Sequence, residues 1–187
     1  MNRTLILSSN SPRRQELLRA LGYTFQIKIK PTEEDFPDEM PCEKVAEFLA
    51  RKKAEVFLKE EISESVLITA DTVVCLDNQI LNKPVDAKNA AVMLQNLSGK
   101  KHEVITGVCI RSADKKVSFS ETTGVYFKLL SEEEIVYYVS NFRPFDKAGA
   151  YGIQEWIGMI GVEKIEGSYY NVMGLPLHRL YAELQKF

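Results

Sequence analysis

The spacing of hydrophobic residues predicts several short β-strands along the chain. Residues 66–76 read VLITADTVVCL, a nearly continuous apolar run that is typical of a strand covered on both faces. Residues 4–8 form a shorter run of the same kind, and hydrophobic residues alternate with polar ones over residues 25–29. Residues 77–84 resemble the return of a hairpin. The remaining strand-like segments are residues 102–111, 117–130 and 159–173.

Helical spacing fills the stretches between these strands. Ser11 is the expected N-cap of a first helix, with Pro12 at its first position and Gly22 after its end. Amphipathic spacing predicts a second helix over residues 42–60. Further helices are expected over residues 86–97, 131–140 and 176–184. Because strands and helices are interleaved, the pattern predicts an α/β fold with a mixed sheet.

Composition and charge narrow the class of protein. A length of 187 residues suggests one domain over residues 1–187, with room for two lobes. The formal net charge of −2 argues against a dedicated nucleic-acid-binding protein, because such proteins rely on a basic surface. The first residues do not resemble a secretory signal, and no stretch approaches the ~20 apolar residues of a membrane span. We therefore expect a cytoplasmic protein without a membrane partner.

Two arginines occupy the first turn of the first predicted helix. A helix N-terminus carries partial positive charge, so Arg13 and Arg14 have the unfavourable sign there unless an anion binds. Backbone N–H groups and two guanidinium groups would then point at phosphate oxygens. Both side chains pointing into water is the alternative. The preceding small polar residues, SSNS, favour an anion site.

A carboxylate interrupts the apolar run at Asp71. A buried, unpaired carboxylate is very unfavourable, so Asp71 needs a cation, a metal ion or a raised pKa. If the strand ends near Ala70, Asp71 lies at its carboxyl end, where ligands collect in open α/β sheets. A turn or capping aspartate is the simpler alternative, but apolar residues continue on the far side.

Three lysines and a glutamate are further candidates. Lys52 and Lys53 both flank the apolar stripe of the second helix, and periodicity does not separate them. Lys83 follows the predicted hairpin and would be an ordinary surface lysine on its own. Glu34 lies in an acidic loop and could form a Mg²⁺ site with Asp71, since Mg²⁺ binds one or two carboxylates together with substrate phosphates.

Six segments in order resemble the Maf (septum-formation) family of nucleoside triphosphate pyrophosphatases. They are SSNSPRRQELL, LARKKA, ADTVVCLDNQILNKP, LSGKKHEVITG, DKAGAYGIQ and EGSYYNVMGLPL. The resemblance implies an inosine-triphosphatase-like α/β fold, with an elongated mixed sheet flanked by helices and two lobes around a central cleft. It implies cleavage of nucleoside triphosphates to the monophosphate and pyrophosphate with Mg²⁺ or Mn²⁺. It also implies a homodimer, action on non-standard or surplus nucleotides, and a link to cell division.

The resemblance also assigns roles to individual residues. It implies a catalytic acid/base at Asp71, an acidic-loop glutamate at Glu34, and phosphate-neutralising lysines at Lys53 and Lys83, which decides between Lys52 and Lys53. Asp71 and Glu34 would hold the metal ion.

The expected substrate-binding residues include those that separate branches of the family. Arg13, Thr72 and Gln154 resemble the branch that acts on dTTP and UTP. Ser9 belongs to the SSNS segment, whose backbone N–H groups are expected to bind phosphates, and Arg14 is expected to support phosphate binding or structure. A pyrimidine presents a carbonyl and an N3–H group, which suit the amide of Gln154.

The chain departs from the family at one position. The family commonly has YGIQG, whereas this chain has YGIQEWIG, so Glu155 and Trp156 could reshape one wall of the base pocket or close it differently, which bears on base preference and not on the reaction. The expected substrates also include modified pyrimidine nucleotides. Residues 141–158 carry no other predicted element and form a long loop of the kind that is usually functional or disordered.

The alternative function is a nucleotide-binding division regulator that does not cleave its ligand.

Overall fold

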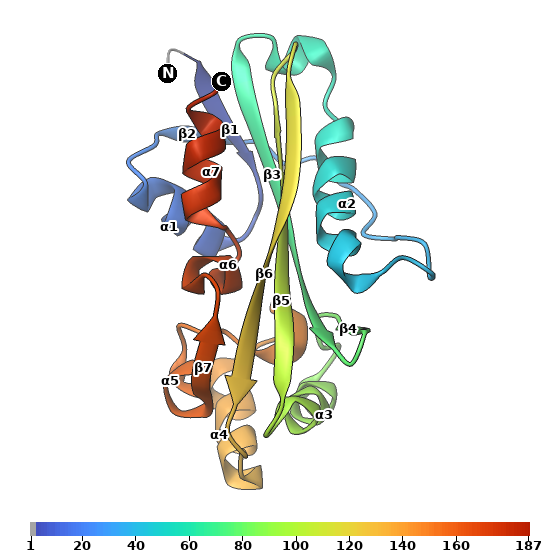
Figure 1. Cartoon of the computed structure of the whole chain (residues 1–187), viewed down its shortest axis with the longest axis vertical. Helices are drawn as coiled ribbons and strands as arrows, with labels where there is room; N and C mark the ends of the chain where they lie inside the picture. The colour runs from blue at the N-terminus through green and yellow to red at the C-terminus, as the bar shows by residue number, and fades with distance from the viewer. Residues whose placement is uncertain (1–2) are drawn as a thin grey trace. The chain divides into compact units, whose positions relative to one another are not determined.

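One mixed sheet is formed within residues 3–187, the part of the chain that the computed structural model describes (Figure 1). Its strand order is β2-β1-β3-β5-β6-β7, and β4 pairs with β3. The strands are β1 (Thr4–Ser8), β2 (Phe25–Ile27), β3 (Ser65–Leu76), β4 (Gln79–Leu81), β5 (Lys101–Arg111), β6 (Lys116–Phe127) and β7 (Val162–Glu166). The predicted α/β class with a mixed sheet is confirmed, since β2, β1 and β3 run parallel while β4 and β7 are antiparallel to their neighbours.

Helices connect and cover these strands. They are α1 (Pro12–Ala20), α2 (Cys42–Glu55), α3 (Ala87–Leu97), α4 (Glu132–Phe142), α5 (Trp156–Gly161), α6 (Tyr169–Met173) and α7 (Leu177–Leu184), with 3-10 turns η1 (Lys59–Ile62) and η2 (Ala148–Ala150). The predicted N-cap is confirmed, because the Ser11 hydroxyl accepts the Arg14 N–H. Within residues 3–187, none of the helices is long and apolar enough to cross a bilayer.

Two sequence-based element predictions are wrong. The segment 159–173 was expected to be strand throughout, yet only Val162–Glu166 is strand and Tyr169–Met173 is helical. The long segment 141–158 was expected to carry no element, yet it contains η2 and the first residues of α5. The helices α5 and α6 have only six and five residues. Helices this short depend on tertiary contacts more than on the helix propensities of their own residues.

The chain divides into two compact units, and neither is a continuous stretch. The first comprises the chain up to Thr72, together with Thr106–Glu121 and Gly174–Phe187. The second comprises Val73–Ile105 and Thr122–Met173. The strands β3, β5 and β6 therefore contribute residues to both units. The prediction of a single domain over residues 1–187 stays a prediction.

In the first unit, α2 packs directly on the sheet. Ile6, Leu67 and Cys109 on the strands form a buried cluster with Ala50 and Ala54 of α2. The buried Thr69 hydroxyl donates to the Ala50 carbonyl at 2.6 Å. The neighbouring strand residues, which point the other way, are also buried, and Figure 1 shows α1 and α7 on that side. This packing explains the continuous apolar run of β3, because both of its faces are covered.

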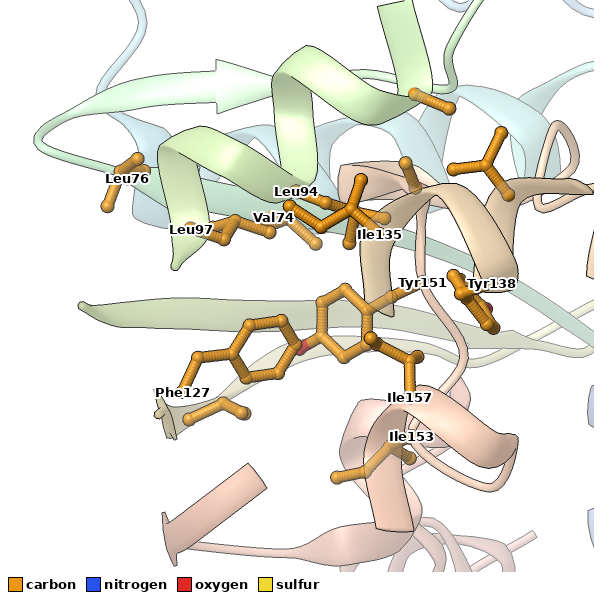
Figure 2. Close-up of a cluster of buried hydrophobic side chains, with 14 of the residues drawn as sticks. Val74, Leu76, Leu94, Leu97, Phe127, Ile135, Tyr138, Tyr151, Ile153 and Ile157 are labelled. Atoms are coloured by element: carbon orange, nitrogen blue, oxygen red, sulfur yellow. The ribbon is translucent and has the colours of Figure 1, made fainter. Parts of the chain in front are cut away.

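In the second unit, the core lies between the strands and the helices α3, α4 and α5. Figure 2 shows Leu94, Ile135, Tyr151 and Ile157 pointing toward one another in this cluster. Here His102 is buried, and its Nε2 lies 2.7 Å from the Tyr151 hydroxyl oxygen. Burial lowers the pKa of His102 to about 4, so this imidazole is neutral near pH 7.

Candidate functional site

Asp71 lies within β3 rather than at its end. The strand continues to Leu76, as the apolar run over residues 66–76 predicted, so the condition that it ends near Ala70 is not met. The parallel pairing with β1 does end here, because its last pair is Ser8 with Thr69. Asp71 is therefore just beyond the carboxyl end of the parallel neighbour, which is where ligands bind in α/β sheets. Asp71 is buried at this point, with only 8% of its surface exposed.

Lys53 joins the two carboxylates that were predicted to act together. Its Nζ lies 2.7 Å from Glu34 Oε1 and also contacts Asp71 Oδ1. The Lys53 side chain is 17% exposed, so the ammonium group is largely withdrawn from solvent. The three residues come from an acidic loop, from α2 and from β3, which sequence spacing alone does not bring together. The structure thus gives Asp71 the cation that its burial requires.

The neighbouring Lys52 has a different partner. Its Nζ contacts the Asp35 carboxylate and lies 3.4 Å from the Asp35 carbonyl oxygen. The Asp35 side chain is 70% exposed, and the ion pair lowers the pKa of that carboxyl. Lys53 rather than Lys52 is therefore the lysine that reaches Asp71, in agreement with the choice made from the family resemblance.

Arg14 binds groups of the protein itself. Its Nε donates to the Gly174 carbonyl at 3.0 Å, and its Nη1 donates to the Ala70 carbonyl at 2.9 Å. Its Nη2 donates to the Thr72 hydroxyl at 2.9 Å, and Nη1 lies 3.5 Å from Ser9 Oγ. These contacts fix β3 to the start of α1 and to the chain before α7. Of the two roles that the sequence left open for Arg14, they favour structure, and its substrate contact stays a prediction.

The charges of this region act on one another. Burial lowers the pKa of Arg14, Asp71 raises it, the like charge of Arg13 lowers it, and Glu34 raises it. Arg13 is half-buried in the first turn of α1. The first unit therefore gathers two guanidinium groups, one ammonium group and two carboxylates that influence one another, and an anion site at the helix start stays a prediction.

We expect Arg14→Ala to lower the free energy of unfolding by about 2–4 kcal/mol, because two backbone carbonyls and the Thr72 hydroxyl lose a charged donor. Arg19→Ala is the matched control, because Arg19 is exposed on the same helix and its Nη2 lies 3.4 Å from Gln15 Oε1. It should change stability by less than about 1 kcal/mol, and urea unfolding measures both variants. Equal loss of stability in both variants would contradict the assignment of Arg14.

Thr72 and Thr106 extend the polar network around Arg14. Their hydroxyl oxygens lie 2.9 Å apart, and Thr72 also accepts from Arg14. The sequence did not single out Thr106 or Gly174. A Cβ on Gly174 would lie 3.4 Å from Arg14 Nε and 3.6 Å from Thr72 Oγ1, and its positive φ of 116° strains any other residue. For Gly174 the sequence offered one signal, a glycine directly before the LPL segment at residues 175–177.

The remaining predicted residues belong to the second unit. Lys83 is exposed in the loop after β4. Gln154 lies in the turn before α5, and its Oε1 is buried without a hydrogen-bond partner among residues 3–187. An unsatisfied buried acceptor costs about 1–3 kcal/mol, so rotation of the Gln154 side chain toward a hydrogen-bond donor outside the turn would recover that free energy.

A family model described as "Maf-like protein" matches residues 4–187. The chain belongs to the Maf family. Over 183 residues it is 48% identical to a dTTP/UTP pyrophosphatase of Bacteroides fragilis (strain YCH46), covering 97% of this chain and 95% of the relative. It is 50% identical to the dTTP/UTP pyrophosphatase of Phocaeicola vulgatus over the same shares. The Porphyromonas gingivalis (strain W83) dTTP/UTP pyrophosphatase is 51% identical, covering 98% of this chain and 94% of the relative.

A solved structure supports the fold of this Maf protein. The Ham1 protein of Staphylococcus aureus matches with a TM-score of 0.56, covering 97% of this chain and 100% of that chain. Its sequence identity is 14%, so the likeness concerns the fold alone. The fold expected from the family resemblance is therefore confirmed.

The carboxylates of this Maf protein suit a divalent cation bound together with substrate. Among residues 3–187, no group of three or more His, Cys, Asp or Glu side chains could hold a metal ion. Two carboxylates, Glu34 and Asp71, converge on one ammonium group. Such a pair fits Mg²⁺ or Mn²⁺, because these ions complete their coordination with phosphate oxygens and water. It does not fit a cation caged by protein side chains alone.

Proposed function

We propose that this protein is a nucleoside triphosphate pyrophosphatase that hydrolyses dTTP and UTP to the monophosphate and pyrophosphate. Membership of the Maf family supports the proposal, as do relatives of about half-identical sequence that are named dTTP/UTP pyrophosphatase. The observation that carries it is the Lys53 ammonium held between Glu34 and the buried Asp71. A binding site for a triphosphate gains little from two carboxylates unless they take part in chemistry.

In the proposed reaction, a water oxygen attacks the α-phosphorus, and the bond to the pyrophosphate group breaks. Asp71 takes the proton of that water, as a general base must lie within hydrogen-bonding distance of it. Lys53 orients the Asp71 and Glu34 carboxylates and, with Arg13, neutralises phosphate charge. Mg²⁺ or Mn²⁺, held by Glu34 and Asp71, would supply further neutralisation and a lower pKa for the bound water.

The other predicted residues keep the roles that the family resemblance implies. Lys83 neutralises phosphate charge, and backbone N–H groups near Ser9 bind phosphate oxygens. Thr72 and Gln154 contact the base. The Oε1 atom of Gln154 has no hydrogen bond within residues 3–187 to break before the amide turns toward a base, and thymine and uracil carry an N3–H donor where cytosine carries an acceptor.

A substrate panel tests the function. The protein is incubated with dTTP, UTP, modified pyrimidine triphosphates, dCTP and purine triphosphates in Mg²⁺ or Mn²⁺, and pyrophosphate is measured. We expect release from dTTP and UTP above the others, and loss of release when EDTA removes the metal. Tight binding of dTTP without pyrophosphate release would instead favour the non-catalytic division regulator, and no release from any nucleotide would refute the enzyme.

Three further properties belong to the same proposal. The protein is expected to act as a homodimer in the cytoplasm, without membrane or nucleic-acid partners. Its biological role would be removal of surplus or modified nucleotides, with an effect on cell-division arrest. Light scattering of the purified protein measures the oligomeric state, and division after controlled overproduction measures the cellular effect.

A further inference from the structure

Glu155, one of the two residues expected to differ from the common family pattern, points into the protein rather than into solvent. Glu155 is the N-cap of α5, but its side chain makes no cap hydrogen bond. Its Oε2 accepts a hydrogen bond from the Tyr138 hydroxyl of α4, and its Oε1 lies 3.0 Å from Lys147 Nζ. The Glu155 side chain is 20% exposed. The charged Glu155 side chain therefore binds partners inside the second unit, although it follows a turn.

Tyr138 holds both ends of this turn. Its hydroxyl oxygen accepts the Gly152 backbone N–H at 3.0 Å while its proton goes to Glu155. The Glu155 N–H in turn donates to the Gly152 carbonyl at 3.0 Å, which closes a ring of hydrogen bonds around Ile153 and Gln154. Burial, followed by the hydrogen bond and charge of Glu155, raises the pKa of Tyr138 far above its usual range, so the phenol stays protonated and remains a donor.

Lys147 balances the charge of Glu155. The Lys147 side chain is 9% exposed, and its Nζ also lies 2.7 Å from Asp146 Oδ1. A carboxylate drawn inward without such a partner would be strongly destabilising. Gly152 provides the space, because a Cβ there would lie 2.9 Å from Glu155 Cδ and 3.1 Å from Lys147 Cε. Five residues with no common sequence period therefore form one closed polar arrangement.

The residues inside the ring face different environments. Ile153 is 6% exposed and joins the hydrophobic core, where Figure 2 shows it near Ile157. Gln154 follows it and carries the buried acceptor without a partner. Because both ends of the turn are tied to one phenol and Ile153 is fixed in the core, the Gln154 backbone has little freedom left.

We infer that Tyr138 and Glu155 are positioning residues that fix the Gly152–Glu155 turn and thereby set the preference of Gln154 for a base with an N3–H donor. The inference rests on the proposed function for its substrate, and on the described hydrogen bonds for its geometry. A fixed turn determines the point from which the Gln154 side chain reaches the base; a loosened turn would let the amide approach from other positions, including ones in which its NH₂ group faces cytosine.

Tyr138→Phe is the principal test, since it removes one oxygen and keeps the ring in the core. We expect the ratio of kcat/KM for dTTP to that for dCTP to fall about tenfold, the effect of losing a hydrogen bond to a charged group. The fall should come from a higher KM for dTTP, with kcat nearly unchanged. Hydrogen exchange of a peptide covering residues 151–157 should become faster.

Tyr126→Phe is the matched control. The Tyr126 hydroxyl donates to Glu166 Oε2 at 2.6 Å, so the substitution removes another Tyr–Glu hydrogen bond of the same unit, away from the turn. It should change neither the nucleotide ratio nor exchange in residues 151–157. If both phenylalanine variants change the ratio equally, or if Tyr138→Phe leaves it within twofold of the unsubstituted protein, the inference is wrong.

Substitutions of Glu155 and Gly152 provide a second test. Glu155→Gln keeps an acceptor for Tyr138 and should retain most of the preference, whereas Glu155→Ala should lose it. Gly152→Ala should be harmful alone and clearly less harmful in the Glu155→Ala background, since the clashing carboxylate is then absent and only the end of the Lys147 side chain remains close. Additive effects, or a Gln variant as impaired as the Ala variant, would overturn the arrangement.

These measurements separate the inference from the proposed function. If the unsubstituted protein releases no pyrophosphate, the enzyme assignment fails, while hydrogen exchange in Tyr138→Phe still decides whether the turn is held as described. If the protein prefers dTTP and Tyr138→Phe keeps that preference, the function stands and the positioning role is refuted.

Discussion

We expect Asp71→Asn to lower kcat for dTTP by about a hundredfold to ten-thousandfold, the usual contribution of a general base. Asparagine keeps the shape of the side chain but cannot take a proton from water. It also removes one of the two carboxylates that contact the Lys53 ammonium group, and Glu34 is the one that remains. Release of pyrophosphate under saturating dTTP measures the effect, and undiminished turnover would refute the role.

Asp35→Asn is the control for this experiment. Asp35 and Lys52 form an ion pair next in sequence to that of Glu34 and Lys53, but the Asp35 side chain is mostly exposed. The substitution removes a similar charge from the same loop, and kcat should remain within about twofold, since exposed ion pairs contribute little free energy. Comparable loss in both variants would indicate that net charge, rather than proton transfer, determines the rate.

A large loss of stability is expected for Gly107→Ala. An added Cβ on β5 would lie 2.2 Å from the carbonyl carbon and oxygen of Ala46 and from the Glu47 nitrogen in α2. Backbone atoms of a helix cannot rotate away as a side chain can, so α2 must shift. We expect the free energy of unfolding to fall by at least about 3 kcal/mol, and the melting temperature by about 6–12 °C.

Gly124→Ala is the control for a clash with backbone atoms, because it adds the same methyl group to a strand glycine that faces only side chains. Gly124 also lies within a strand, but a Cβ there meets only the flexible Lys101 side chain at 3.0 Å and Glu166 Cβ at 3.7 Å. Its stability should change by less than about 1 kcal/mol. Because α2 carries Lys53, a folded fraction of Gly107→Ala should also lose activity; wild-type melting behaviour would show that α2 adapts.

The sequence predicted most elements because local patterns and packing agree there. β1 matches its prediction residue for residue, and α3 begins after its predicted cap, Asp86. The segment 159–173 failed because hydrophobic alternation continues past β7 while tertiary contacts end the strand. Asn171 Nδ2 donates to the Val104 carbonyl and to the Thr123 hydroxyl, both at 3.0 Å, and these partners lie on other strands. A local pattern carries no information about them.

The surroundings of Asp71 were partly predictable from residue type. A carboxylate inside an apolar run predicted that Asp71 needs a partner, and the ion pair with Lys53 supplies one, while its catalytic role stays a prediction. Periodicity left Lys52 and Lys53 equal, and only the direction in which each leaves α2 separates them. No sequence pattern predicts that the Glu155 side chain points into the protein, because its partners Tyr138 and Lys147 follow no common spacing.

The hydrogen bond from Arg14 to the Gly174 carbonyl has a consequence for synthesis on the ribosome. It joins residues 160 positions apart, and the first unit also includes Gly174–Phe187. All residues of the second unit are made before residue 174, so that unit has its full set of contacts earlier. The N-terminal segment must wait roughly 10–30 s for Gly174 and α7, since the intervening residues are added at about 5–20 per second. During that interval the nascent chain exposes the apolar strand β1, and chaperones that bind such strands would meet it there.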